Sequence, residues 1–126
     1  MKCISLLQPY AWCVAAGLKP AETRKWKHAH RGPLLIAASK RIDHDAYAYL
    51  TSIGVILPKK EDLVLGHIIA KTNMAYCIPF TKDLEKFALC PLYDGYVFWL
   101  TETKMLDKPV PVKGMLGIYD VKWPDS

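Results

Sequence analysis

The sequence predicts an α+β protein, a small mixed β-barrel of about five or six strands with two or three short flanking helices. At 126 residues the chain has the length of one domain, and we expect that single domain to span residues 1–126. Segments rich in β-branched and aromatic residues outnumber helical segments in the second half of the chain. Helical and strand segments do not alternate regularly, as they would in a parallel β-α-β sheet. Together these observations favour a barrel.

The first predicted helix covers residues 9–16. Pro9 suits the first position of a helix, and Gly17 supplies a left-handed stop just past its end. The segment 21–26 then predicts a strand, because it mixes polar and β-branched residues. Side chains alternate across a strand, so Glu22 and Arg24 share one face while Thr23 falls on the other.

The next two elements are a buried strand and a second helix. Residues 31–33 form a turn, and the apolar run 34–38 predicts a strand that ends at Ser39 and Lys40. Asp43 is placed to cap a helix that stops at Gly54.

Strands dominate the prediction for the second half. Residues 64–76 form one long strand or a pair, with Gly66 and Asn73 as bend positions, and a short helical turn follows Thr81. The remaining predicted elements are a strand at 96–101, a stiff proline-containing connection at 109–114 that cannot join a central ladder, and a closing strand at 115–121.

The composition favours an anionic partner. Lys and Arg outnumber Asp and Glu by 17 to 12, which gives a net charge of +5 and a pI near 9.0. Nucleic acid is therefore a permitted partner. Gln8 and Pro9 interrupt the apolar N-terminal run, which excludes a secretory signal, and no run reaches the roughly eighteen apolar residues of a membrane span. We expect a cytoplasmic protein without membrane contact.

The cysteines and histidines predict no metal site and no cofactor. The four cysteines lie far apart without a C-x-x-C pair, which favours reduced, buried thiols over disulfides or zinc ligands. The H-x-H at residues 28–30 has no acidic or cysteine partner at ligand spacing, and we interpret it as a solvated pair.

Three blocks of the sequence resemble the ASCH domain, named for its homology to activating signal cointegrator. They are S-L-L-Q-P-Y-A-W at residues 5–12, G-L-K-P-A-E-T-R at 17–24 and R-G-P-L-L-I-A-A-S-K at 31–40. The segments 95–100, 109–114 and 117–119 are similar to the end of such domains, and the resemblance weakens only over about 43–63. It implies a PUA-like barrel that binds RNA or a modified nucleoside. Some members are described as amidohydrolases of N4-acylated cytidine, and others as cleaving RNA.

The family signature G-x-K-x-x-E-x-R falls on Gly17, Lys19, Glu22 and Arg24. Arg24 offers a planar fork of donors and Lys19 a point charge, both suited to phosphate or to a base carbonyl. Glu22 accepts hydrogen bonds from an exocyclic amine or from Arg24 itself. These residues predict a cationic cleft, and the alternative is a structural ion pair between Glu22 and Arg24.

The predicted ligand-binding set also includes Tyr10, Trp12, Ser39 and Lys40. Aromatic side chains stack on nucleobases for roughly 1–3 kcal/mol per base, which makes Tyr10 and Trp12 candidate platforms. Core packing is the alternative for the aromatic residues, and we prefer it for Trp26.

A catalytic role would rest on Lys19 and Glu22. By the resemblance, a lysine, a hydroxyl residue and a distal glutamate act together in the amidohydrolases, and here Glu22 occupies the hydroxyl position. The distal acid is Glu85 or Glu102. Lys19 serves as a base only if its pKa is well below the free value of about 10.4, which pairing with Glu22 opposes.

Two departures from the family pattern keep three functions open. Pro20 and Ala37 stand where relatives often carry polar residues, which removes polar groups from the expected cleft. The sequence favours an RNA-binding module. The alternatives are a small amidohydrolase, with RNA cleavage as its weaker variant, and a protein-interaction domain whose cleft is degenerate.

Overall fold

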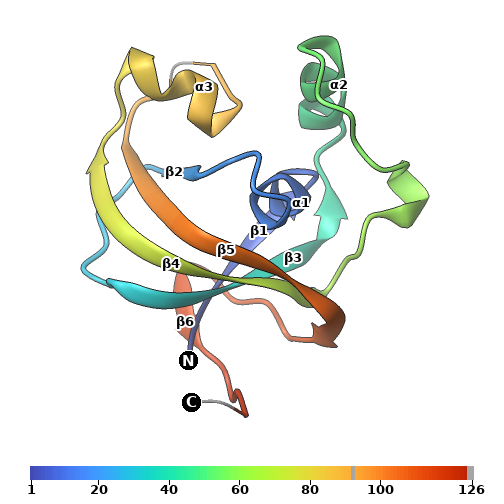
Figure 1. Ribbon diagram of the computed structural model, residues 1–126, viewed down its shortest axis with the longest axis vertical. Coiled ribbons are helices and arrows are strands. Elements are labelled where there is room, and N and C mark those ends of the chain that lie inside the picture. Colours follow the sequence, from blue (N-terminus) through green and yellow to red (C-terminus); the bar gives the residue numbers. More distant parts are fainter. Residues whose placement is uncertain (92, 125–126) are drawn as a thin grey trace.

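One mixed sheet forms the framework of the protein. In the computed structural model, which describes residues 1–91 and 93–124, six strands join in the order β2-β5-β4-β3-β1-β6 (Figure 1). β1 and β3 pair in parallel, and the other ladders between described strands are antiparallel. The strands are β1 (Lys2–Gln8), β2 (Ala21–Arg24), β3 (Gly32–Ile42), β4 (His67–Pro79), β5 (Tyr96–Pro111) and β6 (Ile118–Asp120). The predicted α+β class is confirmed.

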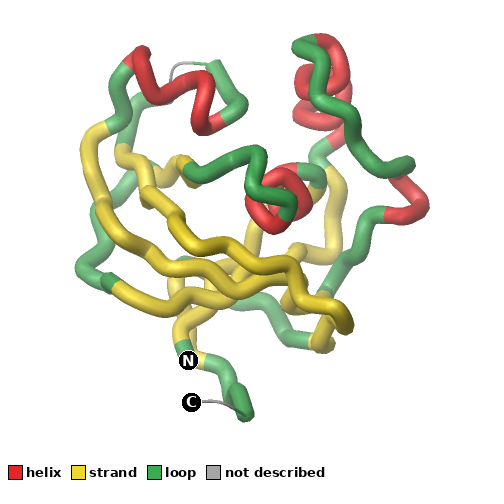
Figure 2. The backbone as a smooth tube through the Cα atoms, in the orientation of Figure 1, coloured by secondary structure: helices red, strands yellow, loops and turns green. Residues whose placement is uncertain are grey.

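Short helices join the strands. They are α1 (Tyr10–Ala15), α2 (His44–Ser52), η1 (Lys60–Asp62), η2 (Lys82–Leu84) and α3 (Glu85–Ala88). Asp43 caps α2 as predicted, since its Oδ1 accepts a hydrogen bond from the Ala46 amide at 2.9 Å. Figure 2 shows α2 and α3 at one end of the molecule and the two termini at the other. Among the described helices, none has the length and apolar character needed to cross a membrane.

β3 is buried on both faces, which explains its uninterrupted apolar run. Leu34, Ile36 and Ala38 point into the main core, where α1 packs against them. The alternate residues Leu35 and Ala37 point to a second, smaller core on the other side of the sheet. Both cores are therefore anchored on one strand, and its polar end emerges beside the helical end of the molecule.

The end of α1 sets the position of the signature lysine. Gly17 adopts a φ of +80° just past the helix, and its amide donates to the Val14 carbonyl at 3.0 Å. The Leu18 amide donates to the Cys13 carbonyl at 2.9 Å, which completes a Schellman motif. The chain thus reverses within three residues and directs Lys19 back towards the sheet.

Several strands differ from the sequence prediction. β1 was not predicted, because the apolar and polar residues of Lys2–Gln8 do not alternate regularly. The segment 109–111, expected to be part of a connection, is instead the end of β5 and pairs with the start of β4. Prolines are tolerated there because β2 covers only the first part of β5, so the far end of β5 has a free edge. The closing strand is shorter than predicted, and β2 ends at Arg24.

The sheet curls until its edge strand β2 approaches β1. The two strands share no ladder, and a side chain spans the gap: Arg24 Nη2 donates to the Ser5 carbonyl at 3.2 Å. α1 lies within this curl, as Figure 1 shows. A cleft opens at the seam between the two strands.

Candidate functional site

The cleft at the seam has a volume of about 660 Å³ and contains most of the predicted site. Tyr10, Lys19, Glu22, Arg24 and Ser39 all line it. These residues come from α1, the loop after it, β2 and the end of β3, and the curl of the sheet brings them together. The volume lies in the range of small-molecule and cofactor sites.

Lys19 is the most deeply buried charged residue of the cleft, with only 2% of its surface exposed. Its Nζ donates to the carbonyl oxygens of Ala21, at 3.0 Å, and of Ala88. It also lies 4.9 Å from the centre of the Tyr10 ring and 3.8 Å from Glu22 Oε1. An ammonium has three N–H donors, and the two carbonyls use two of them. The lysine therefore links β2 to α3 as well as bordering the cleft.

Glu22 lies between the two cationic residues of the signature. Its Oε2 is 3.3 Å from Arg24 Nη2, and its Oε1 faces Lys19, while the residue keeps 7% exposure. This confirms that β2 places the carboxylate beside the guanidinium. Arg24 also contacts β1 through Nη2, yet its buried Nε–H has no hydrogen-bond partner among the described residues. An unpaired buried donor at a cleft is a natural recognition point for an acceptor on a ligand.

Two residues of the predicted set lie outside the cleft. Lys40 is exposed and lines an adjoining cavity, and Trp12 is half-buried and does not line the cleft. Trp26, for which core packing was preferred, is instead 40% exposed, although its ring makes an edge contact with Phe98, with ring centres 5.5 Å apart. Thr23 was expected on the opposite face from Glu22, yet it also lines the cleft.

Further cleft residues were not predicted as part of the site. Arg41 and Asp43 follow Ser39 at every second position, so strand alternation would have placed all three on one face. Cys90 and Tyr93 come from the segment after α3. No local signal links that segment to the signature, because only the folded chain brings the two together.

Burial keeps the Tyr10 hydroxyl and the Cys90 thiol of the cleft protonated. Burial raises the pKa of Tyr10 to about 12, and nearby acidic groups including Asp43 and Glu22 add to that shift. Burial likewise raises the pKa of the Cys90 thiol above its ordinary value, although Lys19 and a hydrogen bond with Thr23 act in the opposite direction. At neutral pH both groups are therefore hydrogen-bond donors rather than nucleophiles.

Neither predicted distal acid reaches the cleft. Glu102 lines a separate cavity of about 230 Å³ beside Lys104. Glu85 begins α3 and does not line the cleft. The two departures from the family pattern lie outside the cleft as well: Ala37 belongs to the smaller core, and the Pro20 carbonyl accepts a hydrogen bond from the Leu100 amide at 2.8 Å.

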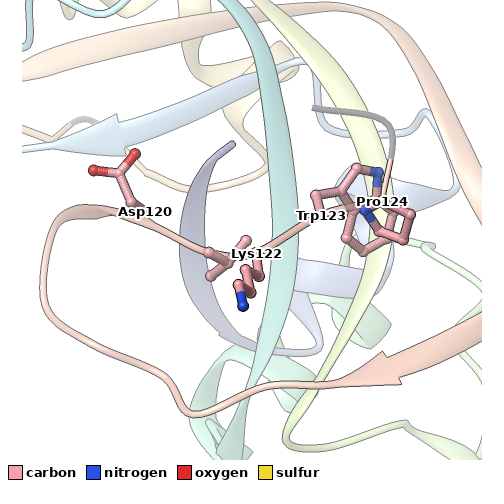
Figure 3. A pocket seen from close by; sticks show the side chains of 5 residues that line it. Asp120, Lys122, Trp123 and Pro124 are labelled. Atoms are coloured by element: carbon pink, nitrogen blue, oxygen red, sulfur yellow. The ribbon is translucent and has the colours of Figure 1, made fainter.

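Two further observations concern metal ligands and a separate cavity. Within residues 1–91 and 93–124, no three His, Cys, Asp or Glu side chains gather as metal ligands. A cavity of about 750 Å³ lies at the C-terminal end, bordered by residues 120–124, and Figure 3 labels four of them. It shares no lining residue with the cleft.

Comparison with known proteins agrees with the fold. The solved structure of ASCH from Zymomonas mobilis matches with a TM-score of 0.64 and 11% identity, covering 96% of this chain and 87% of that one. A mutant of the Zymomonas mobilis protein matches with a TM-score of 0.60 and 10% identity, covering 96% of this chain and 89% of the other. No curated protein sequence matches. The family model for the ASCH domain matches residues 4–110, which is most of the chain, and the chain therefore belongs to the ASCH domain family.

Proposed function

We propose that this protein binds single-stranded RNA and holds one base or nucleoside in the cleft between β1 and β2. The observation that carries the proposal is the arrangement of Glu22 and Arg24: a carboxylate acceptor lies beside a guanidinium whose Nε–H has no partner within the described chain. Nucleobases present donors and acceptors on one edge, which a fixed pair of this kind matches.

Shape and charge support the same ligand. Tyr10 and Tyr93 supply aromatic surface within a cleft of about 660 Å³. Lys19, Arg24 and Arg41 outnumber the two carboxylates that line the cleft, and the whole chain carries a net charge of +5. A moderately cationic, partly aromatic cleft suits a nucleotide better than a neutral metabolite.

An amidohydrolase acting on N4-acylated cytidine is the alternative, because Lys19 and Glu22 do converge on one cleft. The cleft favours it less. The Lys19 ammonium is occupied by two backbone carbonyls, and neither Glu85 nor Glu102 lines the cleft to supply the distal acid. RNA cleavage, its weaker variant, lacks the same groups.

Fluorescence anisotropy with a labelled random-sequence RNA 10-mer tests the proposal. We expect binding at about 50 mM salt, with affinity falling as salt rises. Arg24→Lys keeps the charge but loses the fork, so we expect affinity to fall about tenfold or more, since a charged hydrogen bond contributes about 1.5–3 kcal/mol. A DNA 10-mer of the same length shows whether the ribose is read.

The matched control is Arg31→Lys, an exposed arginine on the turn before β3 that does not line the cleft. We expect it to bind as the parent protein does. The proposal fails if the parent protein does not bind the 10-mer at low salt, or if Arg24→Lys binds it as tightly as the parent. Release of cytidine from N4-acetylcytidine that is lost in Glu22→Gln would establish the hydrolase instead.

A further inference from the structure

A second cavity of about 440 Å³ adjoins the cleft. The two cavities share Ser5, Ser39 and Leu116, so these residues form a ridge between them. The Ser5 hydroxyl lies 2.5 Å from the Tyr119 hydroxyl, which holds the ridge on the side of β6. A ligand that leaves the cleft across this ridge enters the second cavity directly.

The second cavity differs from the cleft in charge. Its lining includes Lys40 and Lys113 and contains no carboxylate, whereas the cleft combines cations with Glu22 and Asp43. Neither lysine forms an ion pair within the described part of the chain. The Lys40 stem passes close to Gly66, because a Cβ added there would meet its Cγ at 3.5 Å and its Cε at 3.6 Å. Two unpaired ammonium groups without an acid partner suit a group that is purely anionic.

Leu116 adds an apolar surface at the ridge. Leu116 is 99% exposed although it lines both cavities, and the neighbouring Met115 is 62% exposed. The loop that carries them passes close to Ser5 at Gly114, where an added Cβ would lie 3.2 Å from Ser5 Oγ. An apolar residue held in water between the two cavities matches a ligand that brings a flat apolar face across the ridge, as a nucleobase does.

We propose that the second cavity is a subsite for the backbone phosphate of the neighbouring nucleotide, with Lys40 and Lys113 as its cations and Leu116 packed against a base at the ridge. The protein then prefers a single-stranded oligonucleotide over a free nucleoside. This inference rests on the proposed function, because it extends the ligand held in the cleft. It also gives a role to Lys40, which the cleft itself does not use.

The test measures how the affinity for the RNA 10-mer depends on salt. Each phosphate contact on a single strand contributes about −0.7 to the slope of log affinity against log salt. We expect the double variant Lys40→Ala/Lys113→Ala to make that slope shallower by about 1.4. Leu116→Ser is expected to weaken binding without changing the slope, because it removes apolar surface and no charge.

The matched control is Lys104→Ala/Lys108→Ala, which removes the same charge from two exposed lysines outside both cavities. The subsite is supported if this control changes the slope much less than the cavity variant does. Equal changes in the two double variants overturn it, since net charge alone would then explain them. If Arg24→Lys weakens binding while Lys40→Ala/Lys113→Ala leaves affinity and slope unchanged, the subsite fails and the proposed function stands. Absence of RNA binding by the parent protein overturns both.

Discussion

Lys19 has two roles that compete in any mutational experiment. It lines the cleft, and it also ties the start of β2 to the end of α3 through the carbonyls of Ala21 and Ala88. A variant that removes its charge changes the fold as well as the ligand site. Arg24 is a better reporter of binding, because 28% of its side chain is exposed and its contacts lie at the seam.

Substituting Lys19 by methionine keeps most of the stem and removes the ammonium. We expect the free energy of unfolding to fall by about 3 kcal/mol, because two buried carbonyls lose their donor and Glu22 loses one of its two cationic neighbours. Urea denaturation followed by circular dichroism measures the change. Lys40→Met is the control, since an exposed lysine should alter stability by less than about 0.5 kcal/mol. Equal stability of the two variants would contradict the structural role of Lys19.

Several contacts between individual residues of the site could be predicted from the sequence. The strand alternation at Glu22 and Arg24 predicted their pairing, and the spacing of the signature placed Lys19 nearby. The lysine's carbonyl partners were not predictable, because Ala88 lies 69 positions away in the chain. Trp12 was predicted to line the cleft and does not. No local feature of the sequence near an aromatic residue shows whether its side chain faces a cleft or packs elsewhere.

At the scale of elements, close backbone packing holds β2 against β5. Arg24 pairs with Tyr96 at the last position of the ladder, directly after Gly95. Gly95 has a φ of +152°, and a Cβ there would collide with the Arg24 carbonyl oxygen. The glycine therefore allows the two strands to meet at the residue that also closes the seam.

Gly95→Ala tests this contact. We expect a loss of about 3 kcal/mol or more in stability, because the collision is with backbone and cannot be relieved by a side-chain rotation. RNA affinity should fall with it, since the Arg24 backbone must shift. Gly17→Ala is the control: it also has a positive φ, but nothing lies within 4 Å of its added Cβ, so about 1–2 kcal/mol of conformational cost is expected. Thermal and urea melts of both variants give the comparison, and similar losses would argue against the collision.

The sequence predicted best the elements that have one solvent-facing side or residues typical of a helix start or end. Asp43 marked the start of α2, and Gly17 marked the end of α1. β1 lacked both signals, since its apolar and polar residues do not alternate regularly. The prolines at the end of β5 led to the wrong prediction that this segment lies outside the sheet. A proline is tolerated in a strand whose outer edge has no neighbouring strand, and the order of strands in the sheet decides whether that is so.

For the whole molecule, the two cores meet on one sheet, which favours cooperative unfolding. That all 126 residues unfold as one unit stays a prediction. The positive charge is spread over the chain, yet the second cavity collects cations without acids. Composition therefore indicated the sign of the partner's charge, and only the fold indicated where that charge would lie.

The seam between β2 and β1 has a consequence for slow motions of the barrel. One guanidinium joins the two strands where a ladder would otherwise run, so opening the seam breaks the Arg24–Ser5 contact and no backbone pairing. Amide protons of β2 should therefore exchange with solvent faster than those of central β3, and still faster in Arg24→Lys. Hydrogen–deuterium exchange read by mass spectrometry measures this, with the β3 peptides as reference. Bound RNA that engages Arg24 should slow the exchange of the β2 amides, so their exchange rate reports whether the cleft is occupied. If the β2 amides of Arg24→Lys are as protected as those of β3, contacts other than the Arg24–Ser5 hydrogen bond close the barrel.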